Sequence, residues 1–124
     1  MQWVKNNDGC GIACVAMIAG ISYKEAKAKM PDECERNGTT SAQLREALTA
    51  FGISTSEKRS LRGKDFHSFS CDAVLHGWAE DEWHWVVWES KRQRVLDPYE
   101  PPLGDPPLIF ECKSFIKILS AKSN

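Results

Sequence analysis

Residues 9 to 20 read Gly9-Cys10-Gly11-Ile12-Ala13-Cys14-Val15-Ala16-Met17-Ile18-Ala19-Gly20, and this stretch decides the fold. Nearly every position from Cys10 to Ala19 carries an apolar or small side chain, so a helix here would be apolar on all faces and must be buried. Polar residues precede the stretch, and Gly20 is the kind of residue at which helices commonly end. The sequence therefore predicts a buried central helix that begins at Cys10.

Two more helices are expected downstream. Two pairs of residues have the spacing of a capping box, in which side chain and backbone at a helix start bond each other: Ser22 with Glu25, and Thr40 with Gln43. We expect the first of these helices to end near Met30 and the second at Gly52. The second also has an apolar face at helical spacing, formed by Leu44, Ala47, Leu48 and Phe51.

After Gly52 the pattern favours strands. The expected strands are Ile53–Ser56, Cys71–Trp78, Trp83–Glu89, Gln93–Asp97 and, weakly, Phe115–Leu119. Because helices come first and strands second, the order favours an α+β fold with an antiparallel sheet packed on the central helix. The proline-rich stretch Pro98–Pro107 is expected to be an extended loop, and nothing divides residues 1–124 into more than one domain.

Composition narrows the classes of partner. The chain has 124 residues with a formal net charge of -1, which gives no electrostatic reason to expect nucleic acid or an anionic membrane as partner. No signal peptide or transmembrane stretch is visible, and five cysteines without regular spacing suit a reducing compartment. We expect a cytoplasmic protein, although a dedicated secretion system needs no leader peptide of the usual kind.

The most informative chemical group is the thiol of Cys10. A thiol at the start of a helix lies near unpaired backbone N–H groups and the positive end of the helix dipole, which favour the thiolate and a developing oxyanion. Gly9 and Gly11 would let a substrate backbone approach closely. The alternative is that Cys10 is a small buried core residue, as many cysteines are.

A histidine and an aspartate further along favour the catalytic alternative. If the strands around them form a hairpin with a two-residue loop at Ser90-Lys91, Glu89 pairs with Arg92 and His84 then lies opposite Asp97 on one sheet face. A carboxylate in that place holds an imidazole in one tautomer and stabilises its protonated form.

These segments together resemble the papain-like cysteine peptidases, and in particular the small bacterial domains that cleave bacteriocin leader peptides after a double glycine. The resemblance rests on Asp8-Gly9-Cys10-Gly11-Ile12-Ala13-Cys14-Val15-Ala16-Met17-Ile18, on His84-Trp85-Val86-Val87 and on Asp97-Pro98. It spans most of the chain. It implies a papain-like fold, with the cysteine at the N-terminus of a central helix and the histidine and aspartate on the sheet.

The resemblance also implies roles for individual residues. Cys10 would be the nucleophile, His84 its base and Asp97 the residue that orients His84. Such peptidases have an oxyanion-hole glutamine a few residues before the nucleophile. Here Gln2 is the only upstream glutamine, eight positions before Cys10, and we assign it this role together with the Cys10 N–H group. Asn6 or Asn7 could supply the amide instead.

Other candidate sites are less favoured. Cys14 lies one turn after Cys10 and could form a metal site with His67 or His76, but paired ligand motifs are absent, so we expect Cys14 in the core and no metal or other cofactor. His67 is expected in a loop, and His76 is expected to be structural. The tryptophans from Trp78 to Trp88 are expected to form core and cleft wall.

The leading functional prediction is a cysteine hydrolase that cleaves a peptide or isopeptide amide bond in a protein or peptide substrate. The same scaffold hosts deamidases and transglutaminases, so these remain alternatives. A noncatalytic peptide-binding module is the alternative from another class. We do not expect the double-glycine specificity to carry over, because we expect no attached transporter segment.

Overall fold

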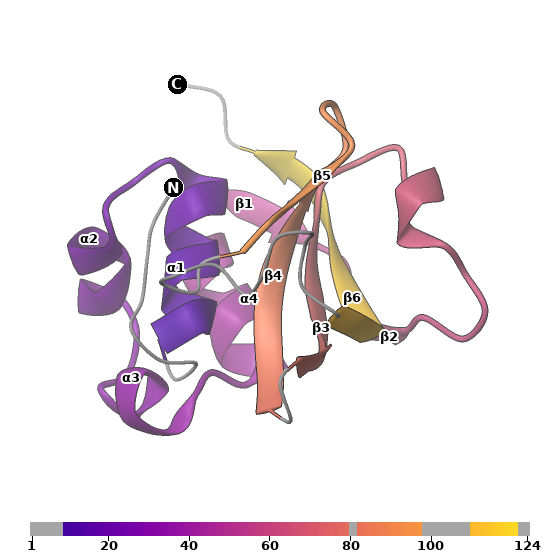
Figure 1. Cartoon of the computed structure of the whole chain (residues 1–124). Coiled ribbons are helices and arrows are strands. Elements are labelled where there is room, and N and C mark those ends of the chain that lie inside the picture. The colour runs from indigo at the N-terminus through magenta and orange to yellow at the C-terminus, as the bar shows by residue number, and fades with distance from the viewer. Residues whose placement is uncertain (1–8, 80–81, 98–109, 122–124) are drawn as a thin grey trace.

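The computed structural model describes residues 9–79, 82–97 and 110–121, drawn in colour in Figure 1. Four helices come first: α1 (Cys10–Ala19), α2 (Tyr23–Ala28), α3 (Glu33–Asn37) and α4 (Ser41–Ala50). The strands follow: β1 (Ile53–Thr55), β2 (Arg59–Ser60), β3 (Ala73–Ala79), β4 (Glu82–Glu89), β5 (Arg94–Leu96) and β6 (Phe110–Ala121). The expected α+β fold with an antiparallel sheet is confirmed.

The helix boundaries follow the signals in the sequence. Helix α1 begins at Cys10, and Gly20 ends it in the left-handed conformation at φ 71°. Both capping boxes form, since Ser22 and Thr40 each exchange bonds with the residue three positions later. Helix α2 ends at Ala28, two residues before the expected end near Met30. Helix α3 was not expected at all.

The strands form a six-stranded sheet in the order β1-β6-β3-β4-β5, with β2 pairing with β6 outside this path. Every pairing is antiparallel. Strand β6 covers twelve residues, whereas the sequence predicted a strand only over Phe115–Leu119. The strand is longer because it pairs with β1, β2 and β3. Figure 1 shows the helices on one side of the sheet and the segment between β2 and β3 on the other.

Strand β4 is buried on both faces, so alternate residues enter two separate cores. Trp85 and Val87 pack with α1, whereas Val86 and Trp88 join a second cluster with Phe115 on the far side. Helix α1 is surrounded by protein, with seven buried residues from Cys10 to Ala16. Each fully buried large apolar side chain stabilises the folded state by roughly 1.5 to 3 kcal/mol. The buried central helix that the sequence predicted is therefore a main part of the core.

Within the described residues, every helix is too short or too polar to span a membrane.

Strand β3 approaches β6 unusually closely at Gly77, which lies opposite His84 on the other neighbouring strand. The pairing of β3 with β6 shifts register at this point, and a Cβ on Gly77 would lie 2.1 Å from the carbonyl oxygen of Glu111. Position 77 therefore requires a glycine because any Cβ would clash with the backbone of β6, and not because of the φ angle at this position.

We expect Gly77→Ala to lower the free energy of unfolding by about 2 to 3 kcal/mol, because the added methyl group forces β3 and β6 apart. Urea unfolding followed by tryptophan fluorescence measures the change. The control is Gly63→Ala, where φ is +74° but no atom lies within 4 Å of the added Cβ, so only about 1 kcal/mol of backbone strain is expected. Equal losses in the two variants would contradict the steric explanation.

Candidate active site

The thiol of Cys10 lies against strand β4. Cys10 is the first residue of α1 and is 2% exposed. Its Sγ atom accepts a hydrogen bond from the backbone N–H of Trp85, at 3.3 Å. Trp85 directly follows His84, so this bond brings the start of the central helix to the strand that carries the predicted base.

His84 and Asp97 are in contact. The Nε2 atom of His84 lies 2.7 Å from Oδ1 of Asp97, and the side chains are 0% and 12% exposed. A carboxylate at this distance fixes the orientation of the ring and stabilises a positive charge on it. The pairing that the sequence predicted between these two residues is therefore present in the structure.

The predicted hairpin register, however, is wrong. The structure pairs Glu89 with Arg94 instead of Arg92, so the loop contains four residues, from Ser90 to Gln93, rather than two. The register moves by two positions, and a shift of two leaves every side chain on its original face. Asp97, one residue beyond β5, therefore stays on the same face as His84 and reaches it diagonally.

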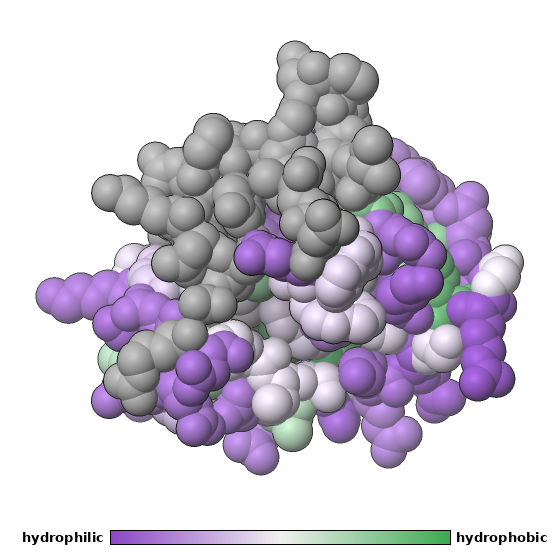
Figure 2. Space-filling model, turned by 60° about the horizontal axis from the view of Figure 1, so that its bottom comes forward, coloured by the Kyte–Doolittle hydropathy of each residue, from purple (hydrophilic) through white to green (hydrophobic). Residues whose placement is uncertain are grey.

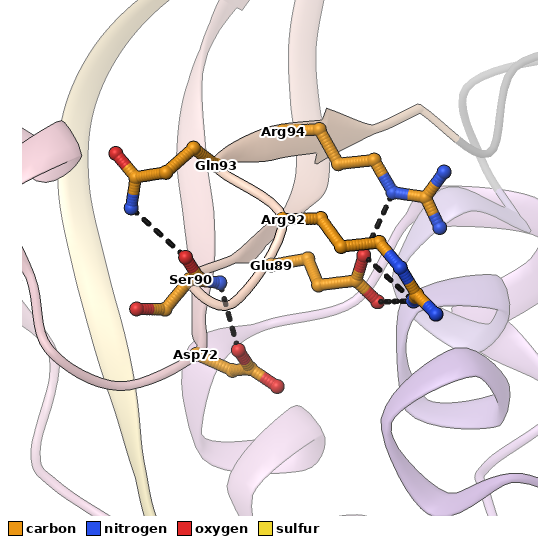
Figure 3. Close-up of polar contacts among 6 residues, drawn as sticks. All are labelled: Asp72, Glu89, Ser90, Arg92, Gln93 and Arg94. Carbon is orange, nitrogen blue, oxygen red and sulfur yellow. Dashed lines mark hydrogen bonds and ion pairs between the residues drawn. The ribbon is translucent and has the colours of Figure 1, made fainter.

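The longer loop is held by a set of polar contacts (Figure 3). Gln93 adopts a left-handed conformation at φ 52°, and its side-chain amide donates to the Ser90 carbonyl at 2.9 Å. The N–H of Ser90 donates to Oδ1 of Asp72, also at 2.9 Å. Glu89 binds the guanidinium groups of Arg92 and Arg94. These contacts favour the four-residue loop and thereby set the position of Asp97.

Burial controls the ionisation of the nucleophile candidate. It raises the pKa of Cys10 to about 12, although the backbone N–H groups of Trp85, Gly11 and Cys10 itself act in the opposite direction. The negative charge of Asp97 raises the pKa further. The expected stabilisation of the thiolate by backbone N–H groups is thus present but weaker than the desolvation. Burial therefore favours the neutral thiol over the thiolate at Cys10.

A cleft of about 500 Å³ opens beside Cys10. One wall is the segment from Asn37 to Thr40, and the other is aromatic, with Trp78, Trp83 and Trp85. The two walls are tied together inside the protein, because the indole N–H of Trp85 donates to the Thr39 carbonyl at 3.0 Å. The sequence reasoning expected the aromatic wall but missed the opposite one. Gly38, just before the Thr40 cap, was its only visible signal.

Close packing at Gly11 allows this arrangement. A Cβ on Gly11 would lie 2.5 Å from the side chain of Thr39. The glycine after Cys10 therefore lets the 37–40 wall meet the first turn of α1. The sequence analysis expected a different role for Gly11, which was to let a substrate backbone approach closely.

Of the remaining candidates, Cys14 and His67 lie away from the cleft, whereas His76 is among its lining residues. Cys14 lies within α1 and is fully buried in the core, and no group of three His, Cys, Asp or Glu residues within the described chain is arranged to hold a metal ion. His67 lies on an exposed 3-10 turn, where its Nδ1 is 2.6 Å from Asp65. His76 is stacked between Trp83 and Trp85. Gln2, Asn6 and Asn7 lie outside the described residues.

Comparison with known proteins agrees with this geometry. Residues 2–104 match the family model described as the Peptidase C39 family. No curated protein matches the chain closely enough to count as a relative. The family match covers most of the chain and includes Cys10, His84 and Asp97. The chain therefore belongs to the peptidase C39 family and is a thiol-dependent cysteine peptidase that acts on a protein or peptide substrate.

Proposed function

We propose that this peptidase cleaves amide bonds with Cys10 as nucleophile, His84 as general base and acid, and Asp97 as the residue that orients His84. One observation carries the assignment: the Trp85 N–H binds the Cys10 thiol while the adjacent His84 binds Asp97. A papain-like arrangement within a single domain of residues 1–124 is part of the same proposal. It is supported by a core that joins α1 to the sheet.

The raised thiol pKa shapes the mechanism that we propose. Because the raised pKa favours a neutral thiol at Cys10, His84 removes its proton as the sulfur attacks the substrate carbonyl. The protonated His84, stabilised by Asp97, then gives the proton to the leaving amine. Water hydrolyses the remaining thioester with His84 again as base, which releases the acid and restores the thiol.

Backbone N–H groups at the start of α1 are suited to the oxyanion that forms during attack. The Cys10 N–H is among the first groups of the helix, which lack partners within it. The role of Gln2 as a second donor stays a prediction. Hydrolysis is favoured over deamidation or transglutamination by the family, and no contact in the described residues favours either alternative or a noncatalytic module.

The first test is cleavage of a proteome-derived peptide library, with new termini identified by mass spectrometry. The wild-type protein should produce cleavage sites that Cys10→Ala and His84→Ala do not, because each variant lacks one reacting group. Cys14→Ala, which changes a buried cysteine one turn away, is the matched control and should retain cleavage. If wild-type and Cys10→Ala give the same products, the nucleophile is misassigned.

A second test concerns Asp97. On a peptide cleaved by the wild type, Asp97→Asn should lower kcat by at least about tenfold with little change in KM, because an amide neither fixes the reactive tautomer nor stabilises the imidazolium. The control is Asp65→Asn, which changes an exposed carboxylate that contacts His67 rather than His84. An unchanged kcat in Asp97→Asn would remove Asp97 from the mechanism.

A third test uses the raised pKa of Cys10. A thiol that loses its proton only above the normal pKa should react with iodoacetamide at a rate that is still rising between about pH 8 and about pH 10. In urea, where burial is lost, the profile should move to that of an ordinary thiol. Mass spectrometry of the Cys10 peptide measures both. A rate that is already constant at neutral pH would show a preformed thiolate and contradict this mechanism.

A further inference from the structure

His76 is held between two tryptophans in the aromatic wall of the cleft. Its ring stacks on Trp83 and on Trp85, with ring centroids 5.0 Å and 4.1 Å away. Trp85 is buried and bonded to the Thr39 carbonyl, so the inner end of this stack is fixed by the core. Because the indoles cover the faces of the imidazole, a ligand in the cleft can meet only the ring edge, which carries both nitrogen atoms.

The ring edge of His76 is not used by the fold itself. Within the part of the chain that the structure describes, no protein group is hydrogen-bonded to either ring nitrogen of His76. The residue is only partly buried, and it lines the cleft together with Cys10. The peptide groups of a substrate leave water when they enter a cleft and then need hydrogen-bond partners there. The edge of His76 is such a partner beside the proposed nucleophile.

The His76 ring is uncharged at neutral pH. Burial is the main cause that lowers the pKa of His76 to about 4, with smaller contributions from Lys58 and His84. One nitrogen of a neutral imidazole donates and the other accepts, as the N–H and C=O of a peptide group do. Charges of both signs lie near the stack, since Glu82 lines the cleft and Lys58 acts on His76. This wall therefore offers a ligand hydrogen bonds rather than a single sign of charge.

The location of the cleft relative to the reacting groups indicates which part of a peptide enters it. Cys10 is among the described lining residues of the cleft, and His84 is not. In the mechanism that we propose, the leaving amine lies near His84, which protonates it. The opposite portion of the peptide, which forms the thioester with Cys10, therefore extends into the cleft. Its main chain passes His76 whatever side chains the peptide carries.

We propose that His76 is a substrate-binding residue that forms a hydrogen bond with a main-chain peptide group on the acyl side of the scissile bond. The inference rests on the proposed function, since it needs Cys10 as the nucleophile. The end of the molecule at the bottom of Figure 1, where β3 meets β4, comes forward in Figure 2. The coloured surface in that view is mostly hydrophilic without one broad apolar patch, which suits a peptide held through its main chain.

The experiment uses peptide acyloxymethyl ketones, which alkylate a catalytic thiol as their carboxylate departs. Blocked tripeptides contain only amides or carry an ester in place of one amide, at each position in turn. An ester has no N–H and is a weaker acceptor, so it probes both hydrogen-bonding roles of the ring. Mass spectrometry of the Cys10 peptide gives the rate constant for labelling. At one position the ester should slow labelling by about fivefold, as expected for one lost hydrogen bond.

Two variants with the same change of side chain isolate the role of His76. His76→Phe keeps a planar ring for the stack but has no ring nitrogen. It should slow labelling by the all-amide probe about fivefold, and the ester at the sensitive position should cause no further loss, because the hydrogen bond is already absent. The matched control is His67→Phe, on the exposed 3-10 turn, which should keep both wild-type rates.

Three outcomes would contradict the proposal. If no ester position slows labelling of the wild type, or if His76→Phe labels at the wild-type rate, the hydrogen bond is absent but the nucleophile stands. The same holds if the losses from His76→Phe and from the ester add at every position. If no probe labels Cys10 in wild-type protein with the circular dichroism spectrum of a folded chain, the proposed function fails, and the role of His76 with it.

Discussion

The contact between the start of helix α1 and strand β4 is the constraint on which the rest of the structure depends. A helix that is apolar on all faces needs cover on all faces, and the sheet, α2 and α4 supply it. Covering the helix also covers its first residue, so the thiol of Cys10 meets the Trp85 N–H in a site removed from water. Burial of α1 therefore determines both the packing of the fold and the environment of the Cys10 thiol.

Burial of the start of α1 sets two electrostatic effects against each other at Cys10. The N-terminus of a helix favours a negative charge, but desolvation disfavours it, and at Cys10 desolvation is larger. The balance makes the imidazole of His84 necessary for every proton movement that we propose. Asp97 acts on both of its neighbours, since it contacts the His84 ring at 2.7 Å and its charge raises the pKa of Cys10.

Local signals predicted much of the architecture. The capping boxes at Ser22 and Thr40 and the glycine after α1 are decided by neighbouring residues, so a reading of the sequence found them. The proximity of His84 and Asp97 was predicted from a hairpin register that proved wrong, because an error of two positions preserves the face of every side chain.

What the sequence could not show depends on distant partners. The loop from Ser90 to Gln93 has four residues because Asp72, eighteen positions earlier, binds its backbone. Strand β6 extends to twelve residues because three other strands pair with it. The 37–40 wall takes its place through Trp85, and the high pKa of Cys10 results from burial by the whole core. Apart from Gly38 in the 37–40 wall, these features have no signal within a short window of sequence.

The hydrogen bond between the Trp85 indole and the Thr39 carbonyl has a consequence for how this enzyme selects substrates. It joins the two walls through a buried contact, so the width at that point is a property of the folded core rather than of a closing flap. In the mechanism that we propose, the substrate would then enter a cleft whose shape exists before it arrives. Residues 37–40 are also far in the chain from His84 and Asp97. Evolution could therefore reshape one wall of the cleft by changes in a short segment while the reacting groups stay where they are.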